Sequence, residues 1–194
     1  VRMRGLTTVF DEPVAAAVVG DETIGRLTNL KVPGLPTDME GRVLYVCSQT
    51  LMKFHPKFDY VIAEIVTRVE GSLVVITYNP NQGVWKNVLE KRMRERIRMM
   101  GEETGRKVVG EVLFVETLPK ASFYSLLSLA SVVLDTFPFG GGVTALESFQ
   151  HGCVIVTYPK GQTVVGLAGG FYKVMGMMDE GLVVGSMEEY VEKA

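Results

Sequence analysis

The sequence predicts an α/β fold: a doubly wound parallel sheet with helices on both faces, in the Rossmann-like arrangement. Strand-sized apolar segments alternate with helical segments along most of the chain, and these strands are apolar at consecutive positions instead of alternate ones. Because crossover helices cover both faces of a parallel sheet, its strands bury both of their sides. The length of 194 residues is that of one such domain.

Residues 1–40 differ in composition from the rest of the chain. Glycines and prolines interrupt its short apolar pieces. Such punctuation is typical of loops, so we expect a lead-in segment, either the tail of a preceding domain or a linker. Residues 41–194 then form the predicted domain. The first residue is Val1, and residues 187–194 read as a helix without a cap, so we expect an excerpt of a longer polypeptide.

The first half of the predicted domain contains three strands. Residues 42–47 (RVLYVC) are β-branched and aromatic, as strands favour, and residues 57–69 carry apolar side chains at the three- and four-residue spacing of one helix face. Residues 72–78 (SLVVITY) form the second strand. A long charged helix over 82–100 leads to the third strand within 108–115.

The second half repeats this alternation. A helix over 122–130 is followed by a strand over 131–136 (SVVLDT), and a helix over 143–150 leads to a strand over 153–158 (CVIVTY). A glycine-interrupted helix over 162–175, a short strand over 182–184 and a helix from near Met187 complete the series. Six strands that alternate with helices in this way indicate parallel pairing.

Charge and hydropathy exclude several kinds of partner. The net charge is −2, and the most basic segment, 86–98, mixes both signs, with Glu90 and Arg94 in the favourable i,i+4 order of a solvated helix face. A protein whose main partner is a nucleic-acid backbone usually has a basic face. No apolar run reaches the length that spans a bilayer. We therefore expect neither nucleic acid nor a membrane as a partner.

The two cysteines indicate a reducing compartment. Cys47 and Cys153 each lie at the edge of an apolar strand-like run. Two lone thiols in a chain of this length make no disulfide framework, and no cluster of Cys and His has the spacing of zinc ligands. We expect no bound metal and a cytoplasmic location, with the nucleus as a second compartment that the sequence leaves open.

The strongest functional signal is the turn within LDTFPFGGGVTALE, residues 134–147. In a parallel sheet the ligand lies beyond the carboxyl ends of the strands. Three glycines before a helix let the main chain approach a ligand, and the N–H groups of the first helical turn then face it. A diphosphate suits such a place. The candidate residues of this turn are Gly140, Gly141, Gly142, Val143, Thr144 and Glu147.

The spacing within this turn is not unique to a diphosphate site. Glu147, one turn into the helix, could reach the hydroxyls of a ribose, but a tight turn followed by an acid that complements the helix dipole fits equally well. Gly140, Gly142 and Ala145 also match the dinucleotide fingerprint. That fingerprint follows the first strand of its unit, whereas this one follows the fourth. We therefore expect no nicotinamide or flavin, and no cofactor is assigned.

A second turn of interest is SQTLMKFHP, residues 48–56. Gln49 and Lys53 follow the first strand, so both could face the crevice of the glycine turn. Lys53 would place a point charge on a phosphate, and Gln49 would donate a hydrogen bond. The alternative is an ordinary solvated loop lysine. His55, before a proline, is expected to cap the turn.

A third turn is ETLPKASF, residues 116–123. Its candidate ligand contacts are Leu118, Lys120 at the mouth of the turn, and Phe123. The ring of Phe123 offers a flat surface on which a base could lie. By sequence alone, Phe123 is better interpreted as a core residue.

Three blocks of sequence give the chain from Val43 onward a family resemblance. They are SQTLMKFHPKFD, the LPK turn with the helix and strand that end in LDTFPFGGG, and ALESFQHGCVIVTYP with its trailing GQT. In composition, order and spacing these blocks resemble the C-terminal domain of a GT-B glycosyltransferase of the O-GlcNAc transferase and SPINDLY type. The most specific of them is LDTFPFGGG followed by the E-x-F-x-x-G-x-x-V-V-T-x-P pattern.

The resemblance implies a function. Members of this family transfer a sugar from a nucleotide diphosphate, usually UDP-GlcNAc and in SPINDLY proteins GDP-fucose, to Ser or Thr hydroxyls of proteins. Their donor nucleotide lies on this C-terminal half without a metal. By position, Lys53 resembles the lysine that contacts the diphosphate and is needed for activity, and Gln49 its neighbouring amide. Lys120 resembles the residue beside the base, and Glu147 the carboxylate that binds ribose.

The resemblance also implies that the protein acceptor and any general base belong to an N-terminal half, so this chain alone is not expected to turn over. Some positions depart from the family pattern. Val143 replaces a side-chain hydroxyl of the phosphate loop with a methyl group, and Gly166 and Leu167 lie where an arginine is common. Phe123 lies where the O-GlcNAc transferases have a base-contacting histidine and where bacterial relatives usually have Phe. These departures leave open a non-catalytic module with a decayed nucleotide site, acting as a scaffold or partner-binding surface, and also a GT-B enzyme of small molecules or lipids.

Overall fold

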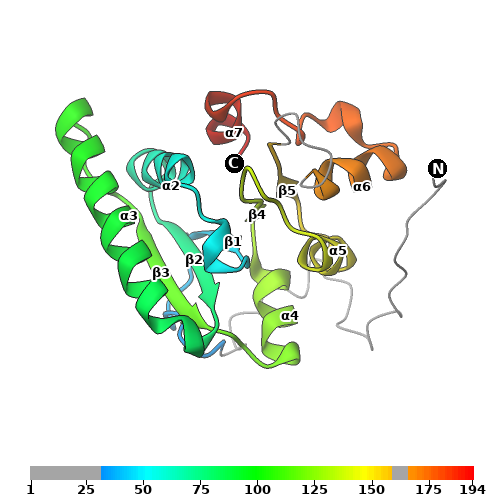
Figure 1. Cartoon of the computed structure of the whole chain (residues 1–194), viewed down its shortest axis with the longest axis horizontal. Coiled ribbons are helices and arrows are strands. Elements are labelled where there is room, and N and C mark those ends of the chain that lie inside the picture. Colours follow the sequence, from blue (N-terminus) through cyan, green and yellow to red (C-terminus); the bar gives the residue numbers. More distant parts are fainter. Residues whose placement is uncertain (1–31, 159–165) are drawn as a thin grey trace.

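The computed structural model describes residues 32–158 and 166–194. Within these ranges it contains one sheet of five strands in the order β3-β2-β1-β4-β5, and every neighbouring pair is parallel, which confirms the predicted fold class. Figure 1 shows helices on both sides of this sheet. The elements are β1 (Val43–Cys47), η2 (Leu51–Lys53), α2 (Pro56–Arg68), β2 (Ser72–Tyr78), η3 (Pro80–Gln82), α3 (Gly83–Thr104), β3 (Glu111–Glu116), α4 (Lys120–Leu129), β4 (Val132–Leu134), α5 (Val143–Gln150), β5 (Ile155–Val156), α6 (Leu167–Met175), η4 (Met178–Glu180) and α7 (Met187–Lys193).

The core explains why the strands are apolar at consecutive positions. In β1, Tyr45 and Cys47 pack on the side of α2, α3 and α7, whereas Leu44 and Val46 pack on the side of α4, α5 and α6. All four side chains are 2% exposed or less. Each strand residue therefore meets one of two apolar layers, as the consecutive apolar pattern predicts.

The order of the strands reverses between β1 and β4. The chain runs outward from β1 through β2 to β3 and then returns through α4, which places β4 on the other side of β1 (Figure 1). The loops after β1 and β4 therefore diverge at the carboxyl ends of neighbouring strands. In open α/β sheets such a crevice is where ligands bind.

The predicted bounds are confirmed for β2 and α5 and need correction elsewhere. The sixth strand over 182–184 is reduced to a single bridge between Thr157 and Val183. Gly181, with a φ of 71°, precedes this segment, and Ser186 caps α7 directly after it, so too few extended residues remain for a ladder.

The last two strands are also shorter than predicted. The strand expected over 131–136 ends at Leu134. Asp135 still donates its N–H to the carbonyl of Val156, and the chain then enters the loop that leads to the three glycines, residues 136–142, which we call the glycine loop. Only Ile155 and Val156 of the strand expected over 153–158 form a ladder. Part of the helix expected over 162–175 lies outside the described residues.

The long charged helix is α3, which continues past the predicted end to Thr104 and stops at Gly105, whose φ of 68° ends it in the left-handed region. Its ion pair between Arg94 and Glu90, at 2.5 Å, confirms the predicted i,i+4 contact. Of the helices within the described ranges, none combines the length and hydropathy needed to cross a membrane.

The end of the lead-in segment packs against the domain. Val32 is 5% exposed in the core layer of α4, α5 and α6, and Leu35 and Met39 pack against the same layer. Residues 1–31 lie outside the described part of the chain, so the division of the chain at residue 40 stays a prediction.

Candidate functional site

The loop after β1 brings a lysine to the crevice. Leu51, which opens the short helix η2, is 4% exposed and anchors it in the core. Lys53, at the end of η2, extends toward the loop that follows β4, and its Nζ donates to the carbonyl of Gly140 at 3.0 Å. Nζ also donates to Oε1 of Gln49 at 2.8 Å. His55 then caps α2, as predicted, by accepting the N–H of Lys57.

The glycine loop approaches these side chains so closely that a side chain at position 141 would displace Gln49. A Cβ atom on Gly141 would lie 2.5 Å from Nε2 of Gln49 and 3.0 Å from Oγ1 of Thr144. Nε2 of Gln49 in turn donates to Oγ1 of Thr144 at 2.8 Å. The amide of Gln49 therefore bridges the loop after β1 and the first turn of α5, and it keeps this position only while residue 141 has no side chain.

The amino-terminal end of α5 keeps N–H groups for a ligand. The N–H groups of Ala145 and Leu146 return to the carbonyl of Gly142, and no side chain caps the helix. Within the described ranges, the N–H groups of Val143 and Thr144 donate to no other protein group. Such unpaired donors at a helix start attract anions.

The electrostatics of the crevice combine one cation with one buried acid. Burial lowers the pKa of Lys53, and the nearby charge of Asp135 opposes that effect. Burial also raises the pKa of Asp135 to about 6, although hydrogen bonds from Gly141 and Thr157 and the charge of Lys53 act to lower it. At neutral pH the site therefore holds an ammonium group in front of a carboxylate that is mostly ionised.

Five of the predicted residues thus come together in one hydrogen-bonded group: Gln49, Lys53, Gly140, Gly141 and Thr144. Val143 begins α5 and is 58% exposed, so it adds an apolar surface to the opening of the helix. Gly142 precedes α5, and a Cβ atom on it would lie 3.2 Å from Cδ1 of Leu167. Glu147 lies one turn further along α5 and is partly buried.

The third predicted turn forms a separate group at the start of α4. Lys120 is the first residue of α4, and its Nζ lies 5.3 Å from the ring centroid of Tyr124. Leu118 and Phe123 are partly buried and pack against the core layer of α4, α5 and α6. That placement agrees with the interpretation of Phe123 as a core residue and leaves its contact with a base a prediction.

Sequence reasoning missed Asp135 and Phe139. Asp135 lies directly beneath the glycine loop, 2% exposed, and its Oδ1 accepts the N–H of Gly141 at 2.6 Å. The signal was an acid at the end of an apolar strand, directly before the glycines. Phe139 is 47% exposed, and Nζ of Lys53 lies 4.6 Å from its ring centroid. An exposed aromatic residue between a proline and three glycines was the signal there.

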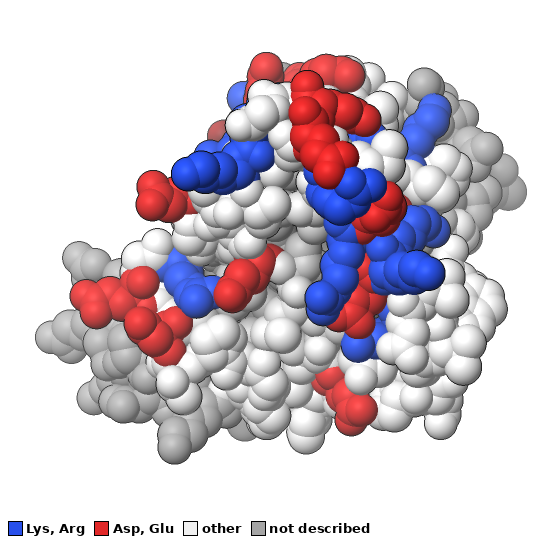
Figure 2. Space-filling view, turned by 90° about the vertical axis from the view of Figure 1, so that its left-hand side faces the viewer, with Lys and Arg blue, Asp and Glu red and all other residues white. Residues whose placement is uncertain are grey.

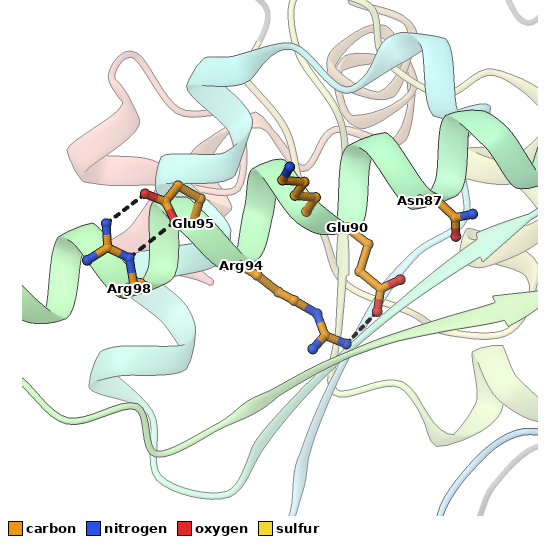
Figure 3. A pocket seen from close by; sticks show the side chains of 6 residues that line it. Asn87, Glu90, Arg94, Glu95 and Arg98 are labelled. Carbon is orange, nitrogen blue, oxygen red and sulfur yellow. Dashed lines mark hydrogen bonds and ion pairs between the residues drawn. The ribbon is translucent and has the colours of Figure 1, made fainter.

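Two of the hollows on the described surface bear on where a ligand could lie. One of about 420 Å³ runs along α3 and is lined by Asn87, Glu90, Lys91, Arg94, Glu95 and Arg98. Figure 3 shows that these side chains come from one helix and form ion pairs within it. Figure 2 shows acidic and basic side chains interspersed on this side of the molecule, so no single charge dominates there. The α3 hollow is therefore a solvated helix face.

The other hollow, of about 390 Å³, lies at the carboxyl ends of β1, β2 and β3 and borders the site. Its lining carries no charged side chain. It consists of Ser48, Gln49, Thr50, Thr77, Tyr78, Asn79, Asn81, Gln82 and Thr117. Within residues 32–158 and 166–194, no group of three or more His, Cys, Asp or Glu side chains is placed so that it could hold a metal ion.

Comparison with known proteins finds similar chains among glycosyltransferases. No protein-family model matches the chain. It is 27% identical over 161 residues to a probable UDP-N-acetylglucosamine–peptide N-acetylglucosaminyltransferase SEC of Arabidopsis thaliana, covering 83% of this chain and 15% of that protein. It is 27% identical over 159 residues to the corresponding SPINDLY protein of Solanum lycopersicum, covering 82% of this chain and 16% of that protein.

A solved structure shares the fold. A mutant of the O-GlcNAc transferase of Thermobaculum terrenum superposes with a TM-score of 0.66 at 21% identity, over 79% of this chain and 28% of that one. These findings confirm the resemblance to the O-GlcNAc transferase and SPINDLY type. The five-stranded parallel sheet and its helices therefore share the fold of the matched part of that O-GlcNAc transferase.

Proposed function

We propose that this chain is the donor-binding domain of a metal-independent glycosyltransferase that moves a sugar, GlcNAc as first choice, from a nucleotide diphosphate sugar to Ser or Thr of proteins. The observation that carries the proposal is the position of Lys53. Its amine reaches the carbonyl of Gly140 at 3.0 Å, beside the unpaired N–H groups of α5. Similarity to two probable peptide N-acetylglucosaminyltransferases supports the same conclusion.

The geometry suits the chemistry of glycosyl transfer. When the bond between the sugar and the diphosphate breaks, negative charge develops on the leaving phosphate. Fixed N–H donors and a cation stabilise that charge more than they stabilise the intact donor. In this proposal Val143 and Thr144 donate main-chain hydrogen bonds, and Lys53 is the catalytic residue that contacts the diphosphate. Gln49 holds Lys53 and Thr144 in place relative to each other, because it forms a hydrogen bond with each of them.

The nucleoside extends from the diphosphate toward the start of α4. Glu147 would bind the ribose hydroxyls, and the base would lie against Leu118, Lys120 and Phe123. Lys120 and Phe123 lie one helical turn apart on α4. These roles follow from the family resemblance, and the neutral polar hollow beside Gln49 is compatible with a hydroxyl-rich ligand nearby.

The acceptor, the cellular location and the partners are proposed for the whole protein. The chain spans 15% and 16% of the length of the two curated relatives, so a protein acceptor held by an N-terminal half is part of the proposal. A cytoplasmic location, with the nucleus as a second compartment, and the lack of nucleic-acid and membrane partners are likewise proposed.

Calorimetric titration of the full-length protein with UDP-GlcNAc and GDP-fucose tests the proposal. We expect one of them to bind, and Lys53→Ala to weaken that binding about tenfold or more, because a hydrogen bond to a charged group contributes about 1.5 to 3 kcal/mol. Lys57→Ala is the matched control, because it removes the same charge from an exposed residue close by. Binding of neither nucleotide sugar, or equal effects of the two substitutions, contradicts the proposal.

One observation favours a second candidate, the non-catalytic module. Val143 and Leu167 place exposed apolar side chains around the glycine loop, at 58% and 44% exposure. A decayed site would regain affinity from a hydroxyl at position 143. A large gain for Val143→Thr in the same titration supports the scaffold, whereas little change supports a working site that uses main-chain donors.

A further inference from the structure

Asp135 joins three parts of the molecule and has no role in the function proposed above. It directly follows β4, and its side chain is 2% exposed. Oδ1 accepts the N–H of Gly141 at 2.6 Å, and Oδ2 accepts the hydroxyl of Thr157 at 2.7 Å. Its main-chain oxygen accepts the hydroxyl of Tyr190 at 3.0 Å. Asp135 therefore ties the glycine loop to the end of β5 and to α7.

These contacts place the carboxylate beneath the loop. Both of its oxygens are occupied by donors of the protein, so neither is presented to a ligand. Gly141, which Asp135 holds, is the middle of the loop. On one side of it, the carbonyl of Gly140 accepts Lys53; on the other, α5 begins with its unpaired N–H groups. The position of Gly141 thus determines where both phosphate-binding features lie.

We propose that Asp135 is a positioning residue for the diphosphate of the nucleotide sugar, an inference that rests on the proposed function. Its ionised carboxylate holds Gly141, and through it keeps Lys53 and the amino-terminal end of α5 facing one space. A carboxylate accepts two hydrogen bonds at once, and charge-assisted bonds are stronger than neutral ones. The same charge also attracts the ammonium group of Lys53.

A purely structural role does not require a charge at this position. An asparagine of the same shape could accept the N–H of Gly141 and donate to the hydroxyl of Thr157, without burying a charge. The carboxylate is instead disfavoured by burial, which raises its pKa to about 6. Besides Lys53 on η2, the ionisable groups that act on it are Cys47 on β1, Tyr172 on α6 and Tyr190 on α7.

The test compares Asp135→Asn with the unmodified full-length protein, titrated calorimetrically with UDP-GlcNAc between pH 5 and pH 7.5. UDP-GlcNAc is preferred to UDP because a terminal phosphate itself ionises near pH 6. We expect the unmodified protein to bind about fivefold more weakly at pH 5 than at pH 7.5, as charge-assisted hydrogen bonds become neutral ones. Asp135→Asn should bind about fivefold more weakly at pH 7.5, without that pH dependence, while its thermal midpoint is equal or higher.

Two controls separate positioning from general damage. Thr157→Val removes one partner of the carboxylate and should weaken binding severalfold, whereas Thr157→Ser keeps the hydroxyl and should restore it. Glu64→Gln neutralises another acid that is 2% exposed, paired with Arg106 at the opposite edge of the sheet. It should lower the thermal midpoint and leave affinity for UDP-GlcNAc unchanged.

The outcomes separate this inference from the proposed function. If the unmodified protein binds and Asp135→Asn binds equally well, or follows the same pH profile, Asp135 does not position the loop. If the unmodified protein binds no nucleotide sugar at any pH, the proposed function fails and this inference fails with it. Should Asp135→Asn not fold, equal affinities of Thr157→Val and Thr157→Ser overturn the inference.

Discussion

At the scale of single residues, Gly141 is the glycine of the site whose replacement would disturb the most contacts. A Cβ atom there would meet the end of the Gln49 side chain at 2.5 Å. That end is flexible, so in Gly141→Ala we expect Gln49 to move away and lose its hydrogen bond to Thr144. The fold should survive at a cost of about 1 kcal/mol, while affinity for the nucleotide sugar drops about tenfold.

Thermal unfolding and calorimetric titration check this prediction together. Gly83→Ala is its control, because a Cβ atom on Gly83, at the start of α3, meets nothing within 4 Å. Alanine is also the better helix former, so this variant should be at least as stable as the unmodified protein. Unchanged affinity in Gly141→Ala would show that Gln49 does not hold the site together.

Asp135 makes stability depend on pH. Burial raises its pKa in the folded protein to about 6, from 3.8 in the unfolded chain. The folded state then retains a proton that the unfolded chain has lost, so this group stabilises the fold below pH 4 and loses that contribution as pH rises through 6. The free energy of unfolding should fall by about 1 to 3 kcal/mol from this group between pH 4 and pH 7. In urea titrations, the free energy of unfolding of Asp135→Asn should fall less between pH 4 and pH 7 than that of the unmodified protein. An equal decrease in both proteins would mean that other groups cause the pH dependence.

Residues that lie close in sequence to a recognisable turn were predictable. Gln49, Lys53 and the glycines each follow a strand, and strand ends meet at one edge of a parallel sheet. Asp135 was not predicted, because an acid after a strand has the appearance of an ordinary loop residue. Its importance depends on donors 6 and 22 positions away in the sequence, and only the folded chain brings them to it.

At the scale of elements, α7 is fastened to the site by one buried tyrosine. Tyr190 is 0% exposed, packs against Phe58 and Phe137, and donates to the main-chain oxygen of Asp135 at 3.0 Å. Tyr190→Phe leaves that buried oxygen without its donor, so we expect a loss of about 1 to 2 kcal/mol of stability in chemical denaturation.

Tyr78→Phe is the comparison for this prediction. The hydroxyl of Tyr78 donates to Oε1 of Glu116 at 3.3 Å on an exposed part of the sheet edge. Water replaces an exposed hydrogen bond easily, so its removal should change stability by less than about 0.5 kcal/mol. Equal losses in the two variants would mean that the contact between α7 and Asp135 contributes little.

Elements with a strong periodic signal and clear ends were predicted best. β2 contains the apolar run 73–76 and lies between Gly71 and the Asn79–Pro80 pair, and α5 follows three glycines directly. β4, β5 and the segment 182–184 were predicted too long. After Leu134 the chain turns toward the glycine loop, and of the run 153–156 only Ile155 and Val156 pair with β4. Gly181, in the left-handed region, precedes 182–184.

At the scale of the whole molecule, the proposed site should couple ligand binding to global stability. A ligand that binds only the native state stabilises it by RT ln(1 + [L]/Kd), about 2.7 kcal/mol at a hundredfold excess over Kd. In a thermal-shift panel of UDP, GDP, UDP-GlcNAc and GDP-fucose, we expect nucleotides of one base to raise the thermal midpoint. Lys53→Ala should shrink that shift, and Lys57→Ala should not. Equal shifts for both bases would contradict a base-specific site at the start of α4.

The overall plan of the site was predictable because strand order is constrained. A reversal between two neighbouring strands of a parallel sheet predicts where loops diverge, and here it unites the turns after β1 and β4. The turn after β3 was predicted to join them. Its residues Leu118 and Phe123 are partly buried against the core layer of α4, α5 and α6, and their contact with a base stays a prediction.

The central place of β1 has a consequence for biosynthesis. β1 is the first strand of the sheet to leave the ribosome, yet one of its neighbours, β4, is completed only at Leu134. Until then the nascent chain exposes one unpaired edge of a strand that is buried in the folded domain, which is a template for pairing with other chains. Translation through β3 and α4 is therefore the interval in which this polypeptide most needs the protection of chaperones.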